Sequence, residues 1–133
     1  MSNRDELANM KEEGIEVTSM EAKTMKDMQK EVDAYIGQFK EGYFSPLAMM
    51  ARLTEEMGEL AREVNHYYGE KPKKTTEIER SIEEELGDVL FVMICMANSL
   101  NIDLETAHNI VMNKFNTRDK DRWTRIDEGE KDA

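Results

Sequence analysis

Residues 85–97 read Glu-Leu-Gly-Asp-Val-Leu-Phe-Val-Met-Ile-Cys-Met-Ala, and this stretch decides the fold. Its second part, from Val89 to Ala97, is apolar on every side of a helix. A helix of that kind is surrounded by protein. Three partner helices from one small chain would struggle to cover it, so we expect a homo-oligomer with this helix near the subunit interface.

Start and stop signals on either side of this stretch divide the chain into four expected helices. Ser45-Pro46 is a strong start signal, because a capping hydroxyl precedes a proline at the first helical position. Thr18 or Ser19, Thr75 or Thr76, and Asp103 are the expected caps of the other three helices. The expected helices cover about 18–39, 46–68, 77–100 and 104–120.

The 133 residues fit one domain, and seven glycines and two prolines are too few for a many-turned β fold. We therefore expect an all-α, four-helix antiparallel bundle that assembles into an oligomer. A flexible charged arm at 1–17 precedes the helical domain at 18–123, and a charged tail follows at 124–133.

Composition limits the partners and the compartment. A net charge of −11 disfavours binding to nucleic acid, while a bound divalent cation can still reverse the sign locally for a phosphorylated ligand. Cys95 is the single cysteine, so no internal disulfide can form. The first residues lack the apolar stretch of a signal peptide, and the apolar run 89–97 is too short to span a bilayer. We expect a soluble, cytoplasmic protein without membrane partners.

Two acidic pairs carry the candidate chemistry. Glu56 with Glu59, and Glu85 with Asp88, are each spaced three residues apart and so lie on one face of their helix. Glu56 and Glu85 fall among apolar residues that form the buried stripe. Solvated helix decoration is the alternative interpretation, because glutamate is a good helix former.

In an antiparallel hairpin the two acidic pairs sit equally far from the connecting loop and should face each other. Carboxylates about 5 Å apart repel by roughly 3 kcal/mol at an effective dielectric near 20, so the cluster needs shared protons or a cation. Oxygen ligands indicate Mg²⁺, with Mn²⁺ as a substitute. On the last helix, Lys114 and Arg118 should return to the level of this cluster and suit a polyphosphate.

A second metal site is a competing interpretation. Glu63-x-x-His66 and Glu105-x-x-His108 resemble the paired motif of di-iron bundles. In an up-down-up-down bundle the two motifs would lie at opposite ends, roughly 25–30 Å apart. We therefore expect both histidines at the surface.

The motif Glu55-Glu56-x-x-Glu59, followed by Glu85-x-x-Asp88 within Glu-Leu-Gly-Asp-Val-Leu, resembles the MazG-type nucleotide pyrophosphohydrolases, relatives of the all-α dimeric dUTPases. The likeness covers about residues 25–123. It implies hydrolysis of a nucleoside triphosphate to the monophosphate and pyrophosphate, in dimers or dimers of dimers. The metal ligands it implies are Glu56, Glu59, Glu85 and Asp88, and the phosphate contacts are Lys114 and Arg118.

The mechanism expected from this resemblance uses a carboxylate as the general base that activates water, and an aromatic side chain is a candidate to stack on the nucleobase of the substrate. Glu55 is the preferred base, with Glu59 as the other candidate, because Glu55 is adjacent to the ligands and less committed to the core. Trp123, Tyr43 or Phe44 can stack on a nucleobase, although such a residue is more often simple packing. The alternative function is a non-catalytic helical dimer that binds a nucleotide or a protein partner.

Overall fold

The computed structural model describes residues 22–70 and 81–126, and these residues form helices and connections without a strand. The all-α class and the four helices of the domain are confirmed. The expected arm at 1–17 and most of the tail lie outside the described residues. The helices are α2 (Met25–Ile36), α3 (Pro46–Tyr68), α4 (Ile82–Ser99) and α5 (Leu104–Thr117).

Helix α2 begins later than the sequence suggested. Thr24 caps it through a capping box, in which the Thr24 hydroxyl accepts from the Asp27 amide and the Asp27 carboxylate accepts from the Thr24 amide. The expected caps Thr18 and Ser19 lie outside the described residues. The helix also ends at Ile36, before Phe39, because Gly37 is its C-cap.

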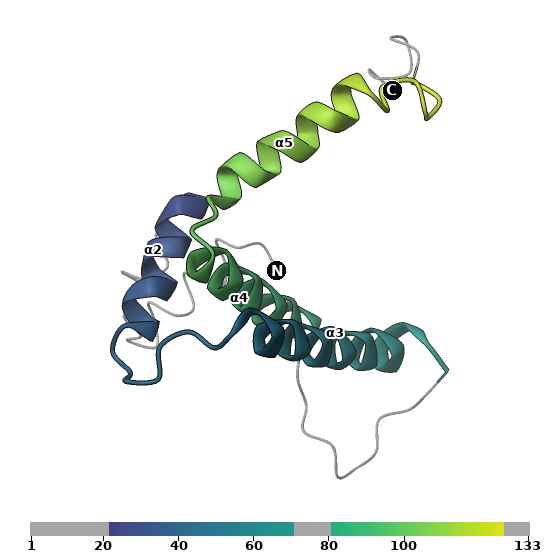
Figure 1. Cartoon of the computed structure of the whole chain (residues 1–133). Coiled ribbons are helices and arrows are strands. Elements are labelled where there is room, and N and C mark those ends of the chain that lie inside the picture. The colour runs from purple at the N-terminus through teal and green to yellow at the C-terminus, as the bar shows by residue number, and fades with distance from the viewer. Residues whose placement is uncertain (1–21, 71–80, 127–133) are drawn as a thin grey trace.

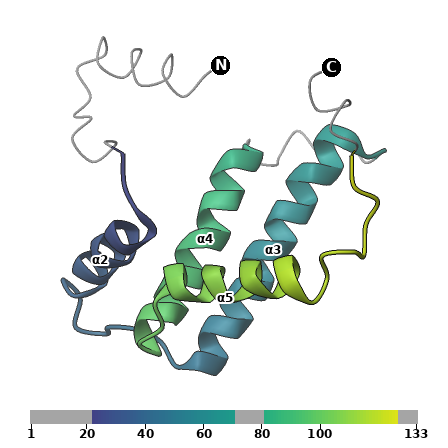
Figure 2. The same ribbon diagram turned by 90° about the horizontal axis from the view of Figure 1, so that it is seen from above.

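Helices α3 and α4 form the antiparallel hairpin that the sequence predicts, and Figure 2 shows them side by side. The bounds of α3 are those expected, with Ser45 as its cap and Gly69 after its end. Helix α4 begins at Ile82 with Ser81 as its cap, and the expected caps Thr75 and Thr76 lie outside the described residues. Ser81 supplies the same chemistry, because its hydroxyl accepts from the Glu84 amide.

The hydrophobic core lies where α2 meets α3 and α4. Val32, Met49, Ile94 and Cys95 form its buried cluster, with one or two residues from each helix. Cys95 is therefore a buried core residue, as its apolar setting predicts. This cluster fixes α2 against the end of the hairpin where α3 begins and α4 ends.

Helix α5 does not return along α4, contrary to the antiparallel arrangement that the sequence suggested. A bend of 104° separates the two helices, and Figure 1 shows α5 leading away from the α3–α4 pair. No residue of α5 is buried. Its exposed apolar side chains include Ile110, Val111, Met112 and Phe115.

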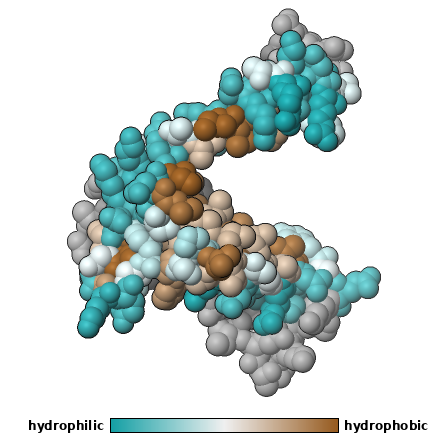
Figure 3. Space-filling view, in the orientation of Figure 1, coloured by the Kyte–Doolittle hydropathy of each residue, from teal (hydrophilic) through white to brown (hydrophobic). Residues whose placement is uncertain are grey.

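The open angle between α5 and the hairpin leaves hydrophobic surface uncovered within one chain. Figure 3 shows the molecule hollowed there, with hydrophobic patches on the α5 arm and on the body. On α4, the apolar side chains of Leu86 and Met93 are exposed as well. No single described helix has the length and hydropathy to cross a membrane; only α4 and α5 taken together, bent as they are, pass by length and composition.

Candidate active site

Four carboxyl groups converge where the middle of α3 meets the first two turns of α4. Glu56 and Glu59 come from α3, and Glu85 and Asp88 come from α4. One oxygen from each lies within 4.8 Å of the others. The three-residue spacing aims each pair across the hairpin, and the antiparallel direction brings the two pairs to one level.

The burial of these acids differs in a way that defines an inner and an outer side. Glu85 is 1% exposed and Glu56 is 6% exposed, whereas Glu59 is exposed and Asp88 is half-buried. The inner pair sits in the apolar stripe between the helices. The outer pair faces solvent, so a ligand can reach the cluster from that side.

The negative charge of Glu56 is only partly compensated by its surroundings. Burial raises the pKa of the Glu56 carboxyl, and the negative charges of Glu59 and Asp88 raise it further. Arg52 opposes this rise, since its Nε donates to Glu56 Oε1 at 3.0 Å. Glu56 Oε2 is buried and has no hydrogen-bond partner among the described residues.

These residues fit a divalent cation. A buried carboxylate oxygen without a donor is costly, and a cation bound among four carboxylates would remove that cost. All the donors are hard oxygens, which suit Mg²⁺ or Mn²⁺. The chain thus supplies an acidic cluster able to hold a divalent metal.

An apolar cavity of about 320 Å³ lies beside the cluster, between α2, α3, α4 and the 37–45 connection. Arg52 joins the two features, because it lines the cavity and bonds to Glu56. Tyr43 and Phe44, two of the expected stacking residues, also line it. The third, Trp123, lies elsewhere and is exposed beside the Arg122 guanidinium.

Lys114 and Arg118 are not at the acid cluster of their own chain. Both belong to the far part of α5 and its cap, which lies away from α3 and α4 (Figure 1). Arg118 pairs with Asp119 at 3.1 Å, and the Lys114 ammonium lies 5.2 Å from the Phe115 ring centre. The expected placement failed because α5 bends away, while the role of these cations stays a prediction.

The other predicted residues have mixed outcomes. Glu55 is exposed and is not among the converging carboxyl groups, so its role as the general base stays a prediction. His108 is exposed as expected, but the expectation for His66 is wrong, because its side chain is only 4% exposed and lies 3.9 Å from Glu63. Glu63 stands seven residues after Glu56, about two helical turns, and so lies on the same face of α3. The helical spacing alone therefore indicates that Glu63 is also buried.

Arg52 is a residue that the sequence reasoning missed. Its signal was available, since it stands four residues before Glu56 and such pairs meet on one helix face. The sequence alone did not separate Arg52 from the other basic residues, because the meaning of the pair depends on the burial of Glu56 and the neighbouring cavity.

Comparison with known proteins agrees with this geometry. Residues 44–123 match the model of the MazG nucleotide pyrophosphohydrolase domain. The uncharacterized protein YpjD of Bacillus subtilis (strain 168) is 78% identical over 110 residues, which cover 83% of this chain and 99% of YpjD.

Two solved structures are similar as well. The crystal structure of a Bacillus-conserved MazG protein, a nucleotide pyrophosphohydrolase, is 92% identical, covers 76% of this chain and 98% of its own, and has a TM-score of 0.65. The structure of YPJD from Bacillus subtilis is 78% identical, covers 72% and 98% of the two chains, and has a TM-score of 0.66. The family model spans more than half of the chain, and the chain therefore belongs to the MazG nucleotide pyrophosphohydrolases.

Proposed function

We propose that this pyrophosphohydrolase uses Mg²⁺ to hydrolyse a nucleoside triphosphate to the monophosphate and pyrophosphate. The observation that carries the proposal is the convergence of four carboxylate oxygens within 4.8 Å, with two of the residues buried. Removal of non-standard nucleotides from the cytoplasmic pool is the role that fits this activity. Mn²⁺ is the expected substitute ion.

Each acidic residue then has a stated task. Glu56, Glu59, Glu85 and Asp88 would hold the ion, which when bound neutralises triphosphate charge and lowers the pKa of a coordinated water. Glu55, which precedes Glu56 in the chain and is exposed, accepts the proton of the attacking water on its carboxylate. The water oxygen bonds to phosphorus, the α–β phosphoanhydride bond breaks, and pyrophosphate leaves.

The apolar cavity beside the cluster supplies the base-binding site in this proposal. Its volume of about 320 Å³ is in the range of small-molecule pockets, and its walls are largely aromatic and aliphatic. Tyr43 and Phe44 lie on the wall contributed by the 37–45 connection. Arg52 stands between the cavity and the carboxylates, where it can contact the sugar or the first phosphate.

A second copy of the chain would cover the apolar surface that α4 and α5 leave exposed. Ile110 is 65% exposed on a helix without buried residues, and the exposed side of α4 needs cover as well. The acidic cluster of one chain and the cations Lys114 and Arg118 of another are complementary in charge. A homodimer, or a dimer of dimers, can thus bring phosphate contacts to a site that one chain leaves incomplete.

The test is pyrophosphate release from a panel of standard and modified nucleoside triphosphates with Mg²⁺. We expect turnover by the wild type, loss of at least about 100-fold in Glu56→Gln, and wild-type rates in the control Glu83→Gln, which changes an exposed acid on the first turn of α4. A chain that turns over no member of the panel, with Glu56→Gln indistinguishable from it, would favour the non-catalytic binding dimer.

A further inference from the structure

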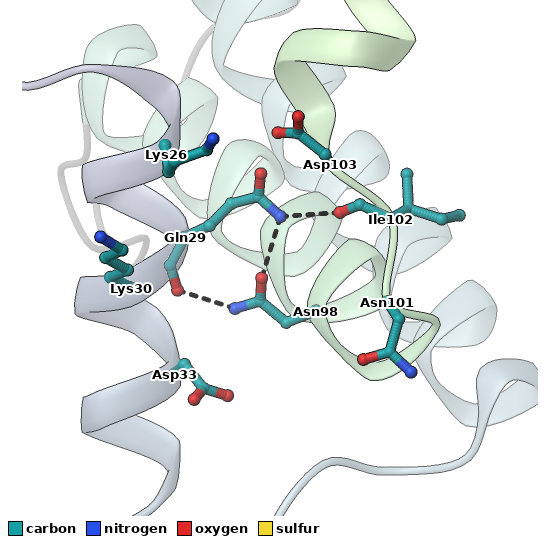
Figure 4. A pocket seen from close by; sticks show the side chains of 8 residues that line it. All are labelled: Lys26, Gln29, Lys30, Asp33, Asn98, Asn101, Ile102 and Asp103. Atoms are coloured by element: carbon teal, nitrogen blue, oxygen red, sulfur yellow. Dashed lines mark hydrogen bonds between the residues drawn. The ribbon is translucent and has the colours of Figure 1, made fainter.

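An open cavity of about 500 Å³, lined mainly by polar and charged residues, lies at the elbow between α4 and α5, on the side of α2. The side chains of Gln29 and Asn98 cross its floor and bond to each other (Figure 4). It is separate from the acidic cluster, and no step of the hydrolysis described above uses it. Its lining residues are Lys26, Gln29, Lys30, Asp33, Asn98, Asn101, Ile102 and Asp103.

Gln29 uses its whole carboxamide to tie α2 to the elbow. Its Nε2 donates to Asn98 Oδ1 at 3.0 Å and to the Ile102 carbonyl at 2.9 Å. Its Oε1 accepts from the Leu104 amide at 3.0 Å. The Leu104 amide is the first of α5, one of the donors that a helix cannot satisfy internally.

Asn98 extends the same network to the 37–45 connection. Its Nδ2 donates to the Gln29 carbonyl at 2.9 Å and to the Tyr43 hydroxyl at 3.0 Å. The Tyr43 hydroxyl in turn donates to Asp33 Oδ1 at 2.7 Å. Four segments of the chain therefore meet through side-chain hydrogen bonds at this one point.

Within one chain the elbow determines where α5 points, because α5 makes few other contacts there. Helix α5 has no fully buried residue, and of its side chains Leu104, at its first position, is the one that packs against the described core. The backbone turn is a Schellman motif, with Asn101 at a φ of 56° and the Ile102 amide donating to the Ala97 carbonyl at 2.8 Å. This motif ends α4, and the bonds from Gln29 then fix the first turn of α5.

A small change in the direction of α5 at the elbow produces a larger displacement at the far end of the helix. Lys114 stands ten residues beyond Leu104, about 15 Å along the axis at 1.5 Å per residue. A swing of roughly 10° would move Lys114 by about 2.5 Å. Displacements of about 1 Å between a positioning group and the reacting atoms can cost on the order of 100-fold in rate.

We propose that Gln29 and Asn98 are positioning residues that set the direction of α5 and thereby aim Lys114 and Arg118 at the triphosphate in the assembled enzyme. This inference rests on the proposed function for its kinetic consequence. Its structural part, the direction of α5, can be measured without any substrate.

The variant Gln29→Glu tests the proposal, because it replaces both donors with an acceptor that faces Asn98 Oδ1 and the Ile102 carbonyl. Gln29→Met is a second variant that keeps the side-chain length and removes the hydrogen bonds without adding charge. Gln38→Glu is the matched control, since Gln38 makes one exposed bond within its own segment.

Two measurements distinguish a change in the direction of α5 from a general loss of folding. Spin labels on cysteines introduced at Arg62 and Asn113, both exposed, report the α3–α5 distance when labelled chains are diluted with unlabelled ones. Cys95 is buried and stays unlabelled in the folded chain. The kinetic readout is KM against kcat, measured beside the Mn²⁺ affinity of the acidic cluster.

We expect a broadened or shifted α3–α5 distance in both Gln29 variants, a KM at least about tenfold higher, and an unchanged Mn²⁺ affinity. Gln38→Glu should match the wild type in all three. Wild-type distances in Gln29→Glu and Gln29→Met would overturn the proposal, as would an altered distance with an unchanged KM. Failure of the proposed function would instead appear as an inactive wild type, which is a distinct result.

Discussion

Replacing Glu56 with glutamine removes one negative charge from the acidic cluster and keeps the size of the side chain. Glu56 is 6% exposed, and its pKa is raised by burial and by the charges of Glu59 and Asp88. Without a bound cation the ionised carboxylate is therefore unfavourable. Glu56→Gln should stabilise the metal-free protein, while the same change weakens the site for a cation.

The magnitude follows from the distances. Two carboxylates 4.8 Å apart repel by about 3 kcal/mol at an effective dielectric of 20. Arg52 at 3.0 Å offsets part of this repulsion, and the loss of that ion pair counts against the variant. We expect a net gain of about 1–2 kcal/mol in the free energy of unfolding, or a melting temperature higher by about 3–8 °C.

The assay is thermal unfolding with EDTA and again with saturating Mg²⁺ or Mn²⁺. The order should reverse between the two conditions, because the wild type gains stability from the bound ion and Glu56→Gln gains much less. Glu55→Gln is the charge-matched control, and we expect its melting temperature to follow the wild type in both conditions because Glu55 is exposed. A Glu56→Gln protein that melts below the wild type in EDTA would refute the reasoning.

Three further predictions concern the core, the assembly and the elbow. Ile94→Ala, at a position 3% exposed, should lower the free energy of unfolding by about 2–5 kcal/mol in urea titrations, and an unchanged midpoint would contradict the assigned core. Ile110→Asp should shift the species seen by analytical ultracentrifugation toward 15.4 kDa, whereas a wild type already at that mass would exclude the homo-oligomer. Burial and the bond to Asp33 raise the pKa of Tyr43 to about 12, so its contribution to stability is complete below pH 10 and is lost as the pH rises through 12. In an ultraviolet titration Tyr43→Phe should remove the tyrosinate step near pH 12, and its persistence would show that another tyrosine causes it.

The parts of the fold that the sequence predicts well are those set by local chemistry. Ser45, Pro46 and Gly69 are start and stop signals that act within one turn of a helix, and α3 has the expected bounds. The convergence of the two acidic pairs was expected from equal distances to the connecting loop, and the four carboxyl groups do meet, although α4 begins at Ile82 rather than near 77. The burial of Glu56 and Glu85 was likewise visible as acids within an apolar stripe.

The direction of α5 could not be predicted in the same way. The residues after α4 end that helix but do not set the angle of the next one. That angle depends on Gln29, which bonds to the Leu104 amide from 75 residues away in the sequence. The placement of Lys114 relied on an antiparallel return, so it failed together with that assumption.

The starts of α2 and α4 and the burial of the His66 side chain were also beyond local reasoning. Thr24 and Ser81 are the caps, yet other hydroxyl residues nearby were equally good candidates from the sequence. His66 stands near a helix end, where exposure is the usual expectation. Its side chain is buried beside Glu63, which depends on tertiary packing at that end of α3.

The most direct test of the central claim is anomalous diffraction from crystals of this protein grown with Mn²⁺. We expect a manganese peak contacted by carboxylate oxygens of Glu56, Glu59, Glu85 and Asp88, and no such peak in crystals of Glu85→Gln. Manganese bound elsewhere, with these oxygens contacting only protein and water, would contradict the assignment of the cluster as the metal site.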